Sequence, residues 1–408
     1  MKNKYWSSIV LTLAILILLF LEIFTLFILG PIRFLQDMKN MEGIAYFLTN
    51  NLPYYRIILL GIIVWVSIGF FKKPKLYPKI LIGVSMLIYF GLFYVSNFVL
   101  KTNKLFYDQN KTNCLPMTSN VVPLDEDVLG VTLNGESRAY PLDYLAYHHK
   151  VLDSVGNEPV LITYCIWSRT GRIFSPVIDG NLEAFSLVGI TEYNAIIADQ
   201  TSGTWWRQAS GEGIAGNKKG KKLDEIYFEQ MPLASWAEAY PNTLVLQPDS
   251  SFIEEYEHNG RFVSRFGVEE NGAEYDSWKE RSWVIGITNN GSAMAFDYHY
   301  LIEYKLMQDS VGDMPVLVVL EPDSISFHTW DRRVGDRLLS FEYIQDDNML
   351  LETQTESIWD MSGTCISGSL AGEKLKHVQS YEEYWHSWES FHPDTEKAGC
   401  DLPGYFGF

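Results

Sequence analysis

Three long apolar runs occupy the first hundred residues of the chain, and they predict helices that cross a membrane. They cover residues 8–29, 54–71 and 80–100. Each has about 18 to 22 residues, the length that an α-helix needs to span roughly 30 Å of hydrocarbon. A cleaved signal peptide would have a shorter apolar core and no further runs behind it. Residues 1–104 are therefore predicted to form an all-α membrane region whose partner is the lipid bilayer.

After this region, short apolar segments and alternating patterns predict strands. Residues 128–134 and 137–142 flank Asn134-Gly135, a dipeptide favoured in tight hairpin turns. A helix is expected over about 142–152, and the apolar segment 159–165 is predicted as a buried strand. Further predicted elements are strands at 171–178, 182–189 and 194–199 and a helix at 233–240, which Pro241 ends. The predicted fold class of the body is α+β, strand-rich and mainly antiparallel.

The body also repeats itself. Residues 130–164 and 286–320 align without a gap at an offset of 156, with 14 identities in 35 positions. Later matches, GNKKGKKL with GSLAGEKL and SWAEAYP with SWESFHP, fall at an offset of 152. The pattern predicts two related units with short connecting segments. The predicted boundaries are a linker at 105–120, a first unit at 121–250, a connector at 251–279, a second unit at 280–400 and a tail at 401–408.

Charge separates the two regions. Residues 1–104 carry 11 basic and 3 acidic residues, and the rest carries 21 basic and 47 acidic residues. Such an acidic body argues against nucleic acid as a partner. Lysines flank the start of the first run and the connection between the second and third, which places both in the cytoplasm by the positive-inside tendency. An odd number of spans then places residues 105–408 outside, in a multi-pass protein of the cytoplasmic membrane.

Cysteines occur only in this outer body, where an oxidising compartment allows disulfides to persist. They are Cys114, Cys165, Cys365 and Cys400, and three pairings are open. One further residue needs explanation in the membrane region. Glu22 lies inside the first apolar run, and an intramembrane carboxylate is either functional or paired with a neighbour.

The segment TYCIWSRTGRIF holds the leading candidates for chemistry. Cys165 ends an apolar strand, and Arg169 and Arg172 follow in the turn and the next strand. Nearby cations favour a thiolate, and an arginine-rich turn also suits an anionic ligand. His148 and His149 on the preceding helix are candidates for a base or a metal ligand. The alternative is that Cys165 is a buried, unreactive cysteine or half of a disulfide.

The second unit is an internal control for these candidates. It has Tyr304, Lys305 and Glu321 where the first unit has His148, His149 and Cys165. The reactive residues are therefore confined to the first unit, and the second is predicted to be a degenerate structural partner. Trp205 recurs as Trp359, which favours a core role over a sugar-stacking platform.

These residues resemble a known family, the bacterial and archaeal domain of unknown function 3179. The resemblance rests on RAYPLDYLAYHHKVLDSVGNEPVLITYC, NAIIADQTSGTWWRQASGEGIAG and GKKL, and it covers residues 128–246. It implies that the family positions fall on His148, Asp153, Tyr164, Cys165, Asn194, Asp199, Trp205, Gly211 and Gly216. Two departures stand out: His149 replaces a usual glutamate, and Ser168 replaces the second cysteine of a pair. The missing cysteine removes a vicinal dithiol, and the family has no activity to transfer.

Two hypotheses follow. In the first, a catalytic or metal-binding site is centred on Cys165 and His148, with a bound metal ion as its cofactor or with thiol chemistry. Asp153 would orient His148, and a wider binding set would comprise Arg169, Arg172, Asn194, Asp199 and Trp205. In the second, the paired units are a non-catalytic binding or scaffolding module for a carbohydrate, a peptide or a membrane protein. Sequence leaves open whether the chain is an enzyme and which partner it has.

Overall fold

The computed structural model describes residues 2–30, 38, 41–102, 106–107, 112–257, 277–345 and 347–399. Contacts within the chain divide it into two compact units. The membrane-helix unit comprises residues 1–107, 183–207 and 212–222, and the body unit comprises 108–182, 208–211 and 223–408. Cys400, the tail and most of the predicted connector lie outside the described residues.

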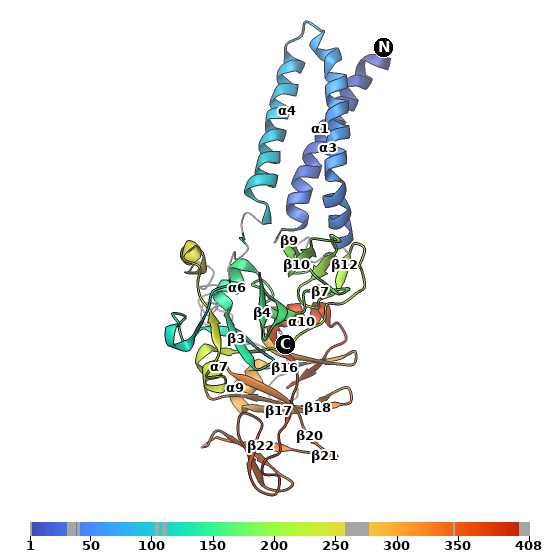
Figure 1. Cartoon of the computed structure of the whole chain (residues 1–408). Coiled ribbons are helices and arrows are strands. Elements are labelled where there is room, and N and C mark those ends of the chain that lie inside the picture. The colour runs from blue at the N-terminus through green and yellow to red at the C-terminus, as the bar shows by residue number, and fades with distance from the viewer. Residues whose placement is uncertain are drawn as a thin grey trace. The chain divides into compact units, whose positions relative to one another are not determined.

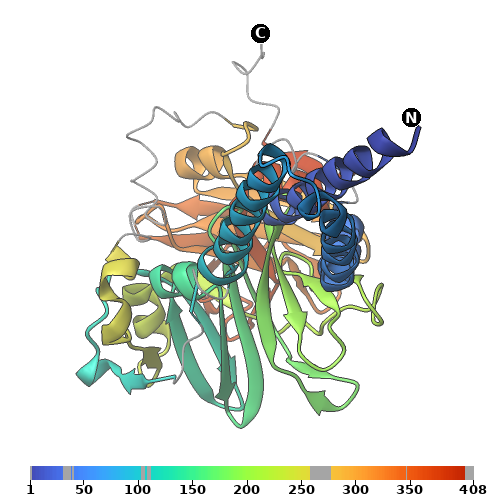
Figure 2. The same cartoon turned by 90° about the horizontal axis from the view of Figure 1, so that it is seen from above.

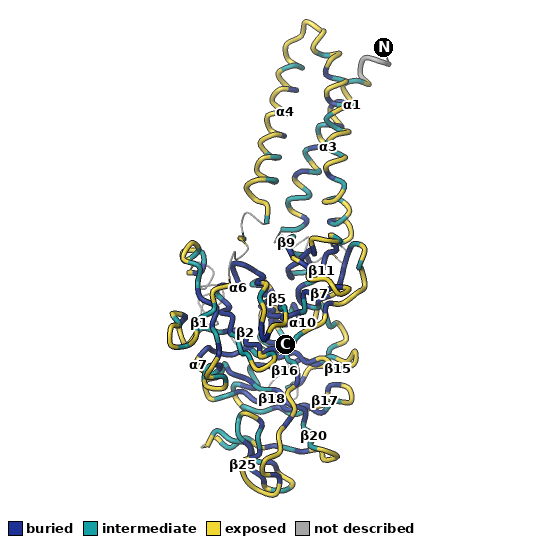
Figure 3. Tube along the Cα trace, viewed as in Figure 1, coloured by how far each residue is buried: buried dark blue, intermediate teal, exposed yellow. Residues whose placement is uncertain are grey.

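Three long helices form a bundle in the membrane-helix unit (Figures 1 and 2). They are α1 (Lys2–Ile28), α3 (Met41–Phe71) and α4 (Tyr77–Tyr94), the last continued by the π-helical segment η1 (Val95–Val99). The segments Trp6–Ile28, Met41–Phe71 and Tyr77–Val99 are long and apolar enough to cross a membrane, as predicted. Their large apolar side chains are mostly exposed (Figure 3), as expected for helices that contact lipid.

A buried polar cluster joins the three helices. Arg56 donates from Nε to Oε1 of Glu22 at 2.6 Å and from Nη2 to Oε2 at 2.8 Å. Ser96 Oγ donates to Glu22 Oε2 at 3.1 Å, and Arg56 Nη2 also donates to Asn97 Oδ1 at 3.2 Å. Glu22 is thus the carboxylate paired with a neighbour, one of its two sequence-based explanations.

A small antiparallel sheet belongs to the same unit and packs against the ends of α1 and α3 (Figure 1). Its order is β12-β11-β10-β9, with β9 (Phe185–Thr191), β10 (Asn194–Asp199), β11 (Trp205–Arg207) and β12 (Gly213–Ala215). Ile190 N donates to Leu29 O at 3.0 Å. The second helix begins at Met41, earlier than the predicted run, because Met41 and Ala45 are buried against this sheet.

The first half of the body unit contains a mixed sheet, a three-stranded sheet and a short hairpin. The orders are β1-β14-β3-β2-β13, β4-β5-β6 and β7-β8. The elements are β1 (Cys114–Pro116), η2 (Met117–Ser119), β2 (Asp127–Leu133), β3 (Glu136–Pro141), α6 (Leu142–His148), β4 (Lys150–Val155), β5 (Glu158–Cys165), β6 (Thr170–Phe174), β7 (Val177–Ile178), β8 (Asn181–Leu182), β13 (Glu229–Pro232), α7 (Leu233–Ala239), β14 (Leu244–Leu246) and η3 (Ser250–Phe252).

Local predictions in this half are confirmed with two exceptions, and the first is that the predicted strands at 171–178 and 182–189 are each divided, into β6 and β7 and into β8 and β9. Asn134 and Gly135 both have positive φ, 49° and 83°, in the two-residue turn between β2 and β3. The predicted helix over 142–152 was too long, because it ends at His148 and β4 begins at Lys150. His149 takes the left-handed conformation, φ 59°, which ends the helix and lets residues 150–155 pair with β5.

The second half of the body unit shows a comparable succession of elements. They are β15 (Trp283–Asn289), β16 (Ser292–Asp297), α9 (Tyr298–Tyr304), β17 (Leu306–Val311), β18 (Met314–Leu320), β19 (Phe327–Asp331), β20 (Arg333–Val334), β21 (Arg337–Leu338), β22 (Phe341–Ile344), β23 (Met349–Glu352), β24 (Ser357–Trp359), β25 (Cys365–Ser367), β26 (Lys376–His377), β27 (Ser380–Tyr384), α10 (Trp385–Phe391) and β28 (Glu396–Ala398). The sheet orders are β27-β15-β16-β28, β17-β18-β19-β26, β20-β21 and β22-β23-β24-β25.

One glycine–tryptophan contact occurs in both halves. A Cβ on Gly130 would lie 2.3 Å from the ring of Trp236, and one on Gly286 would lie 2.2 Å from the ring of Trp388. Each indole also donates to a threonine seven residues later at 2.8 Å. Glycine is needed at both strand positions because the tryptophan of the closing helix lies directly on the backbone.

Candidate functional site

The hairpin of β5 and β6 positions Cys165 and Arg169. Cys165 ends β5 opposite Thr170, and Arg169 closes the turn with φ 60°. The Cys165 side chain is 0% exposed. Reactive cysteines lie in partly exposed surroundings, so this thiol is placed as a core residue.

The two histidines are also buried, in different surroundings. His148 Nε2 and Tyr256 Oη share a hydrogen bond at 2.8 Å, and the rings of Tyr147 and Phe252 pack at its edges. His149 Nδ1 donates to Tyr164 O at 3.0 Å. Burial lowers the pKa of His149 to about 4, so its ring is neutral at physiological pH.

Arg169 is the most unusual charged residue of this region. Its side chain is 4% exposed, and its guanidinium carbon lies 5.7 Å from the ring centre of Tyr384. Within the part of the chain that the structure describes, its Nε and Nη1 have no hydrogen-bond partner. A buried donor without a partner is destabilising by about 1–3 kcal/mol. The hydroxyl groups of Tyr164 and Tyr384 interact with the guanidinium and favour its charged form. Nε and Nη1 therefore remain for an acceptor that the described residues do not supply.

An acid pair that was not predicted lies near Arg169. Asp143 N donates to Glu126 Oε1 at 3.0 Å. Burial, together with the charge of Asp143, raises the pKa of Glu126 to about 9. Burial also raises the pKa of Asp143 to about 6, against the opposing effects of Glu126 and Arg169. The pair shares one negative charge near neutral pH.

Aromatic side chains link this acid pair to His148. Tyr144 interacts electrostatically with Glu126 and Asp143, and its ring centre lies 4.5 Å from that of Tyr256. Tyr256 in turn bonds His148. The sequence signals for the pair were the acidic run LDED, which reaches the first residue of β2, and an acidic residue in the first turn of α6, neither of which specifies a pairing.

Arg172 is placed differently from Arg169, with all of its nitrogens bonded inside the body unit. Nε donates to Ala209 O at 2.9 Å, Nη1 to Gly171 O at 2.7 Å and Nη2 to Glu383 Oε1 at 2.7 Å. The guanidinium also lies 3.8 Å from the ring centre of Tyr381. These contacts give Arg172 a structural role.

Asp153 lies with a different set of partners from those expected. It accepts from Arg138 Nη1 at 2.5 Å and from Tyr140 Oη at 2.8 Å. Cys114 Sγ lies 3.8 Å from its Oδ2, and burial raises the pKa of that thiol to about 12. Asp153 therefore links β3, β4 and β1.

The later predicted residues belong to the sheet of the membrane-helix unit. Asn194 is buried on β10. Asp199 accepts from Trp206 Nε1 at 2.9 Å and from Ser202, and these bonds outweigh burial and lower its pKa. Trp205 is 5% exposed and packs edge-on against Tyr46 of α3 with ring centres 5.2 Å apart. Trp205 is therefore a core residue.

Metal binding finds no support in the described residues. No group of three or more His, Cys, Asp or Glu side chains there is placed to hold a metal ion. A metal bound through His148 and Cys165 would need further ligands of these types.

Comparison with known proteins gives one match. Residues 107–395 match the model of a family described as "Protein of unknown function (DUF3179)". The match extends the resemblance seen in the first half of the body to the second half. No curated protein and no solved structure matches the chain.

Proposed function

The chain belongs to the DUF3179 family of proteins of unknown function, and from this premise we propose that it is a membrane-anchored binding module. Its body would bind a small anion, such as a carboxylate, at Arg169. The observation that carries the proposal is the buried Arg169 guanidinium with two nitrogens that have no partner among the described residues.

Charge-assisted hydrogen bonds favour an anion at this position. A hydrogen bond from an arginine N–H to a carboxylate or phosphate oxygen is about twice as strong as a hydrogen bond between two neutral groups. Asp143 and Glu126 would oppose an anion if both were ionised. Because the pKa of Glu126 is raised to about 9, the pair carries one charge, which the charge of Arg169 balances.

Unused hydrogen-bonding groups favour anion binding over thiol or metal chemistry. Arg169, His148 and Cys165 are all buried. Arg169 has two nitrogens without a partner among the described residues, whereas His148 Nε2 is already bonded to Tyr256. The prediction of a site centred on Cys165 and His148 stays untested, and a ligand at Arg169 uses neither of them.

We further infer the arrangement in the membrane and the origin of the body. Lysines at the start of α1 and between α3 and α4 favour a cytoplasmic N-terminus and a body outside the cytoplasm. The comparable succession of elements and the recurring glycine–tryptophan contact support two related units. The second unit would then be a structural partner of the first.

Thermal unfolding of the full chain in a maltoside detergent tests the anion site. Sodium acetate, phosphate and sulfate are compared with sodium chloride at constant ionic strength, for the native protein, Arg169→Gln and the exposed control Arg333→Gln. We expect at least one anion to raise Tm saturably in the native protein and the control, because a ligand at 100 times its Kd stabilises by about 2.7 kcal/mol.

The variant at the proposed site should not respond. Arg169→Lys, which keeps the charge, guards against loss of the fold, and circular dichroism checks each variant. The proposal is wrong if no anion stabilises the native protein, or if a folded Arg169→Gln responds as the native protein does.

A further inference from the structure

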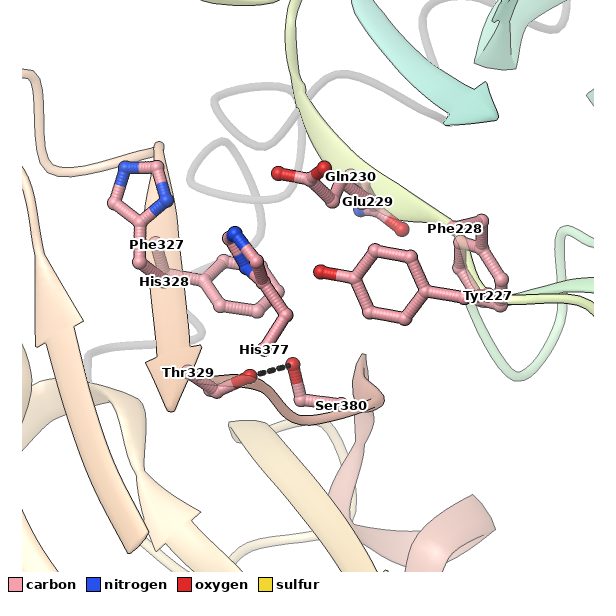
Figure 4. A pocket seen from close by; sticks show the side chains of 9 residues that line it. All are labelled: Tyr227, Phe228, Glu229, Gln230, Phe327, His328, Thr329, His377 and Ser380. Carbon is pink, nitrogen blue, oxygen red and sulfur yellow. Dashed lines mark hydrogen bonds between the residues drawn. The ribbon is translucent and has the colours of Figure 1, made fainter. Parts of the chain in front are cut away.

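A pocket in the body unit lies between the segment before α7 and the strands β19, β26 and β27 (Figure 4). It is a shallow, open pocket whose enclosed part has room for about one water-sized group, so a ligand there stays partly in solvent. Its lining includes Tyr227, Glu229, His328, Thr329, His377 and Ser380. Neither the sequence patterns nor the site at Arg169 involves this pocket.

Some lining groups have partners in the protein. His328 Nε2 bonds Glu321 Oε1 at 2.6 Å, and Thr329 Oγ1 bonds Ser380 Oγ at 2.9 Å. Glu229 Oε1 accepts from Tyr240 Oη at 2.7 Å. These bonds hold the walls of the pocket in place.

Other lining groups remain available. The Tyr227 hydroxyl points toward the His377 ring in Figure 4, and their ring centres are 5.9 Å apart. Among the described residues, neither Tyr227 Oη, the His377 ring nitrogens nor Glu229 Oε2 has a hydrogen-bond partner. Tyr227 is 41% exposed, so a ligand can reach its ring.

The corresponding place in the first half is filled by the protein itself. Arg172 pairs with Thr163 across β5 and β6, and His328 pairs with Val319 across β18 and β19. Arg172 corresponds to His328, and Thr163 to Val319, at the offset of 156 that aligns the two halves. Arg172 covers the ring of Tyr381 and bonds Glu383, whereas the shorter His328 bonds Glu321. The pocket in the second half therefore corresponds to the place that the Arg172 guanidinium, a cation, occupies in the first half.

Among the lining groups, the carboxylate of Glu229 is the charged group that can bind a ligand. Desolvation lowers the pKa of His377 against the opposing charge of Glu229, so its ring is neutral near pH 7. Burial and then the charge of Glu229 raise the pKa of Tyr227, which keeps its hydroxyl protonated. Glu321 is already paired with His328.

We propose that this pocket binds a small organic cation that carries an ammonium group. Glu229 accepts a hydrogen bond from the ammonium, the neutral His377 ring accepts a second, and the Tyr227 ring contributes a cation–π contact. A polyol would use the same hydrogen bonds but would gain nothing from the charge of Glu229. This inference goes beyond the anion site at Arg169 and does not rest on it.

The test compares two molecules of the same shape and different charge, n-propylammonium and 1-propanol. Saturation-transfer NMR on the full chain in maltoside, at constant ionic strength, measures binding of each. We expect saturable binding of the ammonium and none of the alcohol. Glu229→Gln should weaken binding by about tenfold or more, because it removes a hydrogen bond between charged groups.

Two variants and two controls locate the site. Tyr227→Leu should also weaken binding, whereas the exposed controls Glu373→Gln and Tyr304→Leu should bind like the native protein. Tm measurements establish that each variant is folded. Equal saturable binding of 1-propanol would overturn the charge assignment, and unchanged binding in folded Glu229→Gln and Tyr227→Leu would overturn the site.

Discussion

Arg172 of β6 donates to Glu383 of β27 at 2.7 Å, and the two side chains are 3% and 1% exposed. The pair is 211 positions apart in the chain and joins the two halves of the body unit. Ser387 Oγ donates to the other oxygen of Glu383 at 2.6 Å, and Tyr381 covers the guanidinium. A residue that the sequence suggested as a ligand-binding arginine is thus part of the core.

This pair predicts a large loss of stability when one partner is removed. Arg172→Met leaves Glu383 buried without its counter-ion, and we expect a loss of about 3–5 kcal/mol in the free energy of unfolding. Adding Glu383→Gln should recover part of that loss, because the unpaired charge is then absent. Denaturant unfolding of the single and double variants measures the coupling, and additive losses would show that the pair does not act as a unit.

Burial predicts that Cys165 is unreactive in the folded protein. In a variant with serine at the other three cysteines, a maleimide should label Cys165 only after denaturation, because its side chain is 0% exposed. Trp167→Cys in a chain without other cysteines is the matched control, since position 167 is 46% exposed. Rapid labelling of native Cys165 at the rate of that control would contradict this prediction and support the thiol-centred hypothesis.

The polar cluster of Glu22, Arg56, Ser96 and Asn97 should contribute strongly to the stability of the helix bundle. Arg56→Leu leaves Glu22 without its bidentate partner inside the bundle, and we expect a loss of several kcal/mol, about 3–5, in stability against unfolding in SDS. Glu22→Leu combined with Arg56→Leu should be less destabilised than Arg56→Leu alone. Lys73→Leu, at an exposed position, is the control. An Arg56→Leu protein as stable as this control would contradict a structural role.

The acid pair predicts how stability depends on pH. The pKa of Glu126 rises from its ordinary value of 4.5 to about 9 on folding. The folded state therefore holds a proton that the unfolded state releases, and this contribution to stability is complete below pH 4.5 and lost as pH rises to about 9. Glu126→Gln keeps the neutral form at all pH values.

This variant should match the native protein near pH 4 and exceed it by about 2–3 kcal/mol near pH 7. Chemical unfolding from pH 4 to 9 measures the difference, with the exposed neighbour Asp125→Asn as the control. A constant difference across this range would show that Glu126 titrates normally.

Orientation in the membrane can be tested with single cysteines. In a chain without native cysteines, a membrane-impermeant maleimide added to intact cells should label Trp167→Cys, and label Lys75→Cys only after permeabilisation. The expectation follows from the lysines around position 75, which favour the cytoplasmic side. The reverse pattern would place the body in the cytoplasm.

Sequence alone was sufficient where structure depends on neighbours along the chain. The three apolar helices, the Asn134-Gly135 turn and the buried strand that ends at Cys165 all follow from local periodicity or backbone preference. The end of α6 was missed because His149 is not a residue that usually ends a helix, and its left-handed conformation depends on the pairing of the next strand.

What the tertiary structure decided is the set of partners. The sequence favoured a core role for Trp205, a ligand-binding role for Arg172 and a place beside His148 for Asp153. Their partners in the structure are Tyr46, Glu383 and Arg138, none of which the sequence indicated. The raised pKa of Glu126 and the unbonded nitrogens of Arg169 likewise arise from burial among residues of several elements. Interactions of this kind depend on distances in space, and these are fixed only when the strands and helices pack.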